Sequence, residues 1–140
     1  MKPLSFNKKM ISRMEAGMKW QTRRIITGNL RWAPGDILYV REKRYMQKIA
    51  ARIFLQVVSV RIQALIEISE ADVQAEGVEW LISPQNGLKT YLYGKTGTCT
   101  NPTYAFGHLW EEIHGPGSFF GNQETMVAVI EFKIIAKPKI

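Results

Sequence analysis

The sequence predicts an α+β domain in which short strands and short helices are mixed, as in a mixed β-barrel. The expected order is helix, strands, helix, helix, strand, which is not the regular alternation of a Rossmann domain. The 140 residues are 46% apolar and 22% charged, an ordinary globular composition that suffices for one core. We therefore expect a single domain over residues 1–140.

Three helices are predicted from signals at their ends. A short polar side chain that can cap the first turn precedes each helix, and a glycine follows its last turn. The predicted helices are residues 8–16, between Asn7 and Gly17; the segment from Ser69 to Gly77; and the segment from Asn101 to Gly115.

The strands are predicted from runs of β-branched and aromatic residues. Residues 37–40, 52–60 and 125–135 each read as a strand, and 61–68 adds another with imperfect alternation. Residues 83–101 combine glycines, a proline and polar residues, and they predict a long loop or an irregular hairpin.

Several classes of protein are disfavoured by what the sequence lacks. No apolar run approaches the roughly 20 residues of a membrane span, and no secretory signal is visible, so we expect a cytoplasmic protein without a membrane partner. Cys99 is the single cysteine, and His108 and His114 are the only histidines. These residues supply no disulfide and few zinc ligands, so we expect neither a metal nor a cofactor.

The net charge of +7 is unevenly distributed. Residues 1–52 contain 13 Lys and Arg against three acidic residues, whereas the rest of the chain contains six against nine. A one-sided basic surface attracts polyanions, most often nucleic acid, although a solvated basic surface without a partner also fits.

Six short motifs follow one another along nearly the whole chain. They are GMKWQTRR (17–24), PGDILYVRE (34–42), ARIFL (51–55), ISEADVQAEGV (68–78), FGHLW (106–110) and VIEF (129–132). Together they resemble the ASCH family, and most of all the small ASCH proteins of bacteriophages and prophages. The resemblance implies a PUA-like β-barrel with two or three short flanking helices, and it implies binding of RNA or a ribonucleoside.

The resemblance also implies a site. One bacterial branch of the family hydrolyses the acetyl amide of N4-acetylcytidine with a lysine, a threonine and a glutamate. Its lysine lies two residues after a glycine and its threonine three residues further on, as Lys19 and Thr22 follow Gly17. Glu76, in the segment Ala71-Asp72-Val73-Gln74-Ala75-Glu76, matches the branch glutamate, which lies in the helix after the middle strands. The chain departs from the phage-type pattern in its short 43–50 segment and in Met126-Val127-Ala128, where tryptophans are usual.

These three residue types suit acyl transfer. A lysine whose pKa is lowered by burial can take the proton of a threonine hydroxyl, and a glutamate can orient the lysine or protonate the leaving amine. A structural ion pair between Lys19 and Glu76 is the competing interpretation. Ribonuclease activity and a non-catalytic phage accessory role also stay open.

Basic and aromatic residues around these motifs are candidates for RNA contacts. The candidates for phosphate contact are Arg23, Arg24, Arg41, Lys43 and Arg44. Trp20, which polar residues flank, is the candidate for stacking on a base. Cations that merely protect a strand edge would give the same pattern.

Overall fold

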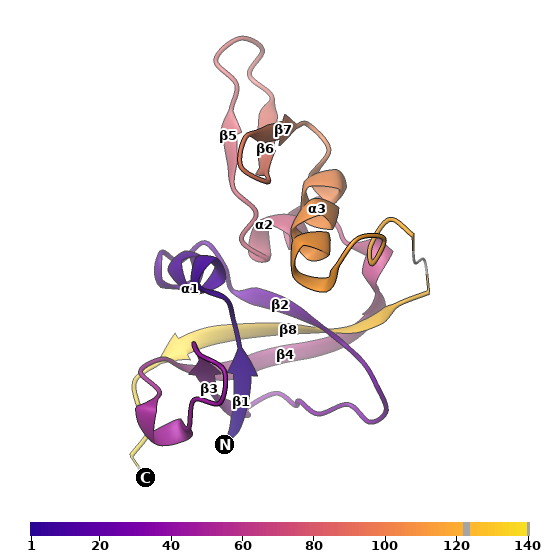
Figure 1. The fold of residues 1–140 in the computed structure, drawn as a ribbon. Helices are drawn as coiled ribbons and strands as arrows, with labels where there is room; N and C mark the ends of the chain where they lie inside the picture. The colour runs from indigo at the N-terminus through magenta and orange to yellow at the C-terminus, as the bar shows by residue number, and fades with distance from the viewer. Residues whose placement is uncertain (122–123, 140) are drawn as a thin grey trace.

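The computed structural model describes residues 1–121 and 124–139, and it confirms the α+β class. A five-stranded sheet in the order β1-β3-β4-β8-β2 forms one part of the molecule, and a three-stranded sheet in the order β5-β6-β7 forms another, with α2 and α3 beside it (Figure 1). The strands are β1 (Lys2–Ser5), β2 (Gln21–Ile25), β3 (Ile37–Arg41), β4 (Phe54–Ala64), β5 (Trp80–Ile82), β6 (Lys89–Tyr93), β7 (Gly97–Cys99) and β8 (Met126–Ile135). The helices are α1 (Lys8–Glu15), α2 (Glu70–Ala75) and α3 (Pro102–His114), with 3-10 turns at Lys48–Ala50 and Leu65–Glu67.

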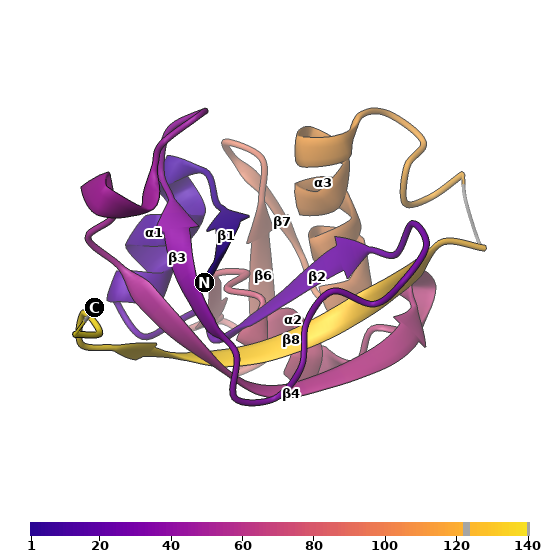
Figure 2. The ribbon, with the colours of Figure 1, turned by 90° about the horizontal axis from the view of Figure 1, so that it is seen from below.

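The larger sheet is built on β4 and β8, which pair antiparallel along almost their whole length. Val127, Ala128, Val129 and Ile130 are all fully buried, so both faces of β8 are covered at its centre. A register shift between Val57 and Ser59 bends β4. The resulting sheet is strongly curved, with α1 lying within its curve (Figure 2).

The curved sheet does not close into a barrel among the described strands, because β1 and β2 are its two edges. A side chain bridges part of the gap between them: Arg24 on β2 donates a hydrogen bond of 2.7 Å to the carbonyl of Ser5 on β1. The general mixed α+β architecture is therefore confirmed, whereas the closed form of the predicted barrel is not seen.

All three predicted helices are present, and the residues that cap them were predicted correctly. Asn7, Ser69 and Asn101 each accept a hydrogen bond from a backbone N–H in the first turn of the helix that follows. Gly17 and Gly77 follow α1 and α2 with positive φ angles of 76° and 93°. The two glycines lie next to residues of the site described below: Gly17 comes two residues before Lys19, and Gly77 directly follows Glu76.

Two predictions about strands need correction. Residues 52–60 and 61–68 form one strand, β4, followed by a 3-10 turn, because the pairing of β4 with β8 continues from Phe54 to Ala64. Residues 83–101 are not one long loop; β6 and β7 pair antiparallel, which confirms the hairpin that was the alternative prediction. The edge strands β1 and β2 were not predicted.

No helix within the described residues is long and apolar enough to cross a membrane.

Candidate functional site

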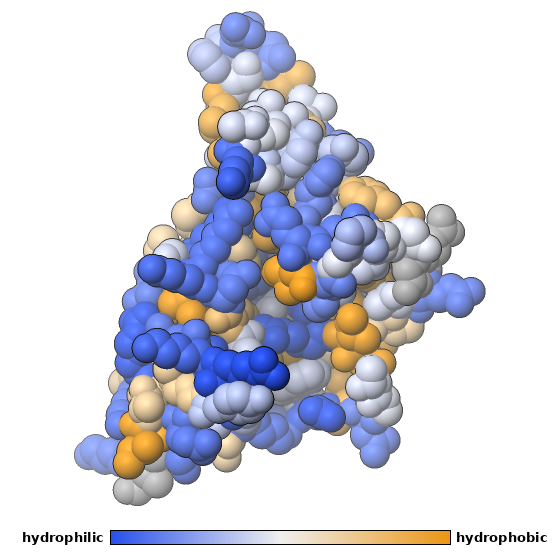
Figure 3. Space-filling model, in the orientation of Figure 1, coloured by the Kyte–Doolittle hydropathy of each residue, from blue (hydrophilic) through white to orange (hydrophobic). Residues whose placement is uncertain are grey.

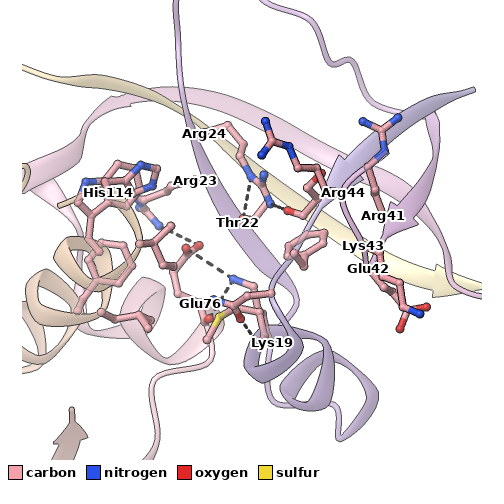
Figure 4. Close-up of a pocket in the computed structure, with 18 residues that line it drawn as sticks. Lys19, Thr22, Arg23, Arg24, Arg41, Glu42, Lys43, Arg44, Glu76 and His114 are labelled. Atoms are coloured by element: carbon pink, nitrogen blue, oxygen red, sulfur yellow. Dashed lines mark hydrogen bonds and ion pairs between the residues drawn. The ribbon is translucent and has the colours of Figure 1, made fainter. Parts of the chain in front are cut away.

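A pocket of about 480 Å³ lies where the two sheet edges face α3. Its wall has two chemically different parts. The part from α3 is largely apolar and includes Phe106, Leu109, Trp110 and Ile113, whereas β2 and the segment that begins at the end of β3 supply most of the charged residues. Figure 4 shows His114 on one side of the pocket, Arg41, Lys43 and Arg44 on the other, and Lys19 and Glu76 between them.

Lys19 and Glu76 form a buried ion pair. Lys19 Nζ lies 3.8 Å from Glu76 Oε1, and the two side chains are 4% and 5% exposed. The ammonium also donates hydrogen bonds to the carbonyls of Gln21 (2.6 Å) and Glu76 (3.0 Å). A Cβ on Gly77 would lie 2.9 Å from Lys19 Cβ, so the glycine lets the lysine pass close to the end of α2.

Burial shifts the pKa values of both partners toward their neutral forms. It lowers the pKa of Lys19 to about 8, against the opposing attraction of Glu76. It also raises the pKa of Glu76, against the attraction of Lys19 and Arg23. Groups in this condition exchange protons more readily near neutral pH than ordinary lysines and glutamates do.

Thr22 lines the same pocket and is 5% exposed. Its hydroxyl accepts a hydrogen bond of 3.3 Å from Arg24 Nε. Within residues 1–121 and 124–139, no hydrogen bond joins Thr22 to Lys19 or Glu76. The structure thus brings the three predicted residues to one pocket. Lys19 and Glu76 form an ion pair, whereas Thr22 accepts its hydrogen bond from Arg24.

Arg23 is held by side chains of the protein rather than left open. Its side chain is fully buried, and its terminal nitrogens contact Glu76 Oε2 (3.4 Å), Asp72 Oδ2 (3.2 Å), Gln63 Oε1 (2.8 Å) and Gln21 Oε1 (2.5 Å). The guanidinium of Arg23 was predicted to contact phosphate. These contacts engage it within the protein instead, so Arg23 has a structural role.

Asp72 is the residue of this network that sequence reasoning missed. Its carboxylate accepts hydrogen bonds from Arg61 (2.8 Å) and Gln21 (3.1 Å) besides Arg23. Although partial burial acts to raise the pKa of Asp72, these hydrogen bonds and the Arg23 charge hold it well below its usual range. The sequence showed Asp72 only as part of a capping signal.

The other predicted contact residues fall into two groups. Arg24, Arg41, Lys43 and Arg44 all line the pocket. Trp20 does not line it, although its side chain is 47% exposed. The sequence therefore located the basic wall but not the aromatic one.

The aromatic wall comes from α3, whose residues were read as core or surface positions. His114 stacks on Trp110 with ring centroids 4.0 Å apart. Burial, and then the nearby charge of Arg24, lower the pKa of His114. The only sequence signal for this wall was the apolar face of the predicted helix.

No group of three or more His, Cys, Asp or Glu side chains that could hold a metal ion occurs among the described residues.

Three solved structures resemble this fold. The ASCH domain from Lactobacillus crispatus JV V101 has a TM-score of 0.60 at 14% identity, covering 97% of this chain and 80% of that one. Protein EF3133 from Enterococcus faecalis V583, assigned to DUF984, has a TM-score of 0.55 at 14% identity, covering 91% and 68%. The hypothetical protein PH0355 has a TM-score of 0.52 at 18% identity, covering 96% and 100%.

No family model matches the sequence, and no curated protein matches it. At these identities the likeness concerns the fold alone: the chain has the fold of an ASCH domain.

Proposed function

We propose that this protein binds a ribonucleoside, free or within RNA, in the pocket between β2 and α3. The observation that carries the proposal is the division of the pocket, of about 480 Å³, into an apolar aromatic wall and a basic wall. A nucleotide unit of RNA presents a flat base and, a few ångströms away, a phosphate, so it matches both walls, whereas a free ribonucleoside presents only the base and sugar. The volume also falls within the roughly 300–1,000 Å³ of small-ligand sites.

The α3 wall suits the base. His114 and Trp110 are already stacked, and the exposed side chain of Ile113 borders them. Stacking on such surfaces tolerates every base, because each base has a π-face. Figure 3 shows that the face seen in Figure 1 is largely hydrophilic, with its hydrophobic groups in small separate patches. Such a face suits a polar ligand better than a broad apolar partner.

We extend the proposal to family membership. The six motifs and the likeness in fold to a solved ASCH domain support a place in the ASCH family. Binding of RNA or a modified nucleoside is the activity that this resemblance implies. A phage or prophage origin, a cytoplasmic location, ribonuclease activity and a non-catalytic accessory role stay predictions.

A matched pair of isoleucine variants tests the proposal. Ile113 lines the pocket and Ile49 lies outside its lining; both side chains are exposed, at 51% and 88%. Calorimetric titration with ribonucleosides and short single-stranded RNA should show binding that Ile113→Asn weakens severalfold and Ile49→Asn leaves unchanged. Wild-type protein that binds neither ligand contradicts the proposal, and so does equal binding by all three proteins.

A second candidate function is an amidohydrolase acting on N4-acetylcytidine. The observation in its favour is the buried Lys19, whose lowered pKa of about 8 leaves roughly a tenth of it neutral at pH 7. Neutral Lys19 would take the proton of Thr22, whose oxygen would attack the acetyl carbon. The amide C–N bond would then break, the cytidine amine would leave with the lysine proton, and water would release acetate from the threonine ester.

Catalysis ranks second because Thr22 is engaged by Arg24 and not by Lys19. Incubation with N4-acetylcytidine distinguishes the two functions. An amidohydrolase should release acetate with wild type and with Thr22→Ser but not with Lys19→Ala or Thr22→Val. Binding without any loss of the acetyl group would leave only the first function.

A further inference from the structure

Four basic residues of the pocket wall form no ion pair with any other described residue. They are Arg24, Arg41, Lys43 and Arg44, which we call the open basic wall. No ion pair to any of them occurs in the part of the chain that the structure describes. The two acidic residues of the pocket do not neutralise them: Glu76 pairs with Lys19 and Arg23, and Glu42 pairs with Arg52 at 2.6 Å.

Arg24 is the most enclosed member of the open basic wall. Its direct contacts are all neutral: the hydroxyl of Thr22, the carbonyl of Ser5 at 2.7 Å and the ring of Phe6, 4.7 Å from the guanidinium carbon. The charge of Glu76 attracts Arg24 without forming an ion pair with it. Burial lowers the pKa of Arg24 to about 10, so it keeps its full charge at neutral pH. A charge in such surroundings is stabilised when an anion is brought to it.

Local contacts orient the side chains of Arg41 and Arg44. Arg41 donates hydrogen bonds to the carbonyl of Met46 (3.1 Å) and the hydroxyl of Tyr39 (3.2 Å), which orient its guanidinium without neutralising it. Arg44 lies 5.1 Å from the ring of Tyr45, a residue with a φ angle of 65°. A left-handed angle is uncommon outside glycine, and here it turns the chain just after Lys43 and Arg44.

We infer that the open basic wall is a phosphate site, and that the ligand of the pocket is a nucleotide carrying a terminal monophosphate. The inference rests on the proposed function and names its substrate class. The base lies on the α3 wall and the phosphate on the opposite side. Arginine forks pair with phosphate oxygens through two parallel hydrogen bonds, and two positioned arginines with two exposed cations suit a dianion. A free mononucleotide and the phosphorylated end of an RNA strand share this chemistry.

Calorimetric titration at constant ionic strength tests the inference. The probes are each ribonucleoside, its 5′-monophosphate, inorganic phosphate, and a short RNA with either a 5′-phosphate or a 5′-hydroxyl. The monophosphate should bind about tenfold more tightly than the nucleoside, as charge-assisted hydrogen bonds to two or more cations predict. A higher affinity for the phosphorylated RNA than for the free mononucleotide identifies the strand end as the source, and the reverse identifies the mononucleotide.

A matched pair of double variants separates the wall from general charge. Lys43→Gln with Arg44→Gln should remove most of the advantage of the monophosphate over the nucleoside. Both side chains are exposed, so the fold tolerates the change. Lys48→Gln with Lys133→Gln removes the same charge from exposed positions outside the pocket lining, and it should change neither affinity.

The failures are distinguishable. Equal affinity for nucleoside and monophosphate overturns the phosphate site and leaves the proposed function standing. Absence of binding by both removes the proposed function as well. Inorganic phosphate that binds as tightly as the monophosphate overturns the nucleotide as ligand, because the base then contributes nothing.

Discussion

The basic residues of the pocket fall into two groups that carry the same sign of charge but differ in their surroundings. At the inner end, Lys19 and Arg23 are buried and paired with Glu76 and Asp72. On the open basic wall, the arginines meet only neutral groups, and Lys43 and Arg44 are exposed. Charges of the first kind depend on one another, because removing one partner leaves the other buried and uncompensated. Charges of the second kind have no ion-pair partner among the described residues and are available to an anion.

This contrast explains why residue type alone does not identify a binding residue. Arg23 and Arg24 are neighbours on β2, yet successive strand residues point to opposite faces. Both residues line the pocket, but Arg23 is bound by the carboxylates of Asp72 and Glu76, whereas Arg24 reaches the carbonyl of Ser5 on β1. Stability should respond to changes at the inner end, and binding should respond to changes at the open wall.

The largest expected effect is that of Glu76→Gln on stability. The substitution leaves Lys19 and Arg23 charged and buried without their shared carboxylate, which should lower the free energy of unfolding by about 3–5 kcal/mol. Urea denaturation measures it. The control is Glu42→Gln, whose partner Arg52 is 55% exposed; it should cost less than about 1 kcal/mol. If the two variants lost similar amounts of unfolding free energy, the buried ion pairs of the pocket would not differ from an exposed ion pair.

The next effect is the pH dependence that Lys19 produces. Its pKa is about 8 in the folded protein and higher in the unfolded chain, so the unfolded state binds more protons between these values. The free energy of unfolding should therefore rise with pH, by about 2 kcal/mol between pH 7.5 and 9.5. Denaturation curves of wild type and Lys19→Met across this range isolate the contribution of Lys19 to the pH dependence. Parallel profiles would show that Lys19 is not a buried cation with a lowered pKa.

A smaller effect is expected from Asp72→Asn. The substitution weakens the hold on Arg23 and should lower the free energy of unfolding by about 1–3 kcal/mol at neutral pH. The pKa of Asp72 is depressed in the folded protein, so its contribution is present above the unfolded pKa and is lost as the pH falls through the folded value. The gap between wild type and variant should accordingly narrow in acid. Arg61→Gln, at a partner that is 42% exposed, is the control and should cost less.

The sequence predicted those parts of this architecture that local chemistry decides. The helices begin after Asn7, Ser69 and Asn101 because a capping side chain acts on a backbone N–H only a few residues away. Strand β2 escaped prediction because Gln21 and Arg23 are polar yet buried. What buries them is a network with Asp72, about fifty residues further along the chain, and no local pattern records it.

The candidate site divides in the same way. Lys19, Thr22 and Glu76 were located through a resemblance, and the structure places all three in one pocket. The α3 wall was missed, because the approach of Trp110 and His114 to β2 depends on how the two sheets and α3 pack. Helical periodicity showed that α3 has an apolar face, but not that part of this face borders a pocket.

The smallest effect on stability and the most selective effect on binding should come from the open wall. Lys43→Gln with Arg44→Gln removes no ion pair of the described structure, so the free energy of unfolding should change by less than about 0.5 kcal/mol. For single-stranded RNA, each lost phosphate contact should reduce the slope of log affinity against log salt by about 0.7. Titrations at a series of salt concentrations measure this slope. An unchanged slope would mean that RNA does not use the open wall, and the difference between the two parts of the pocket would then be one of stability alone.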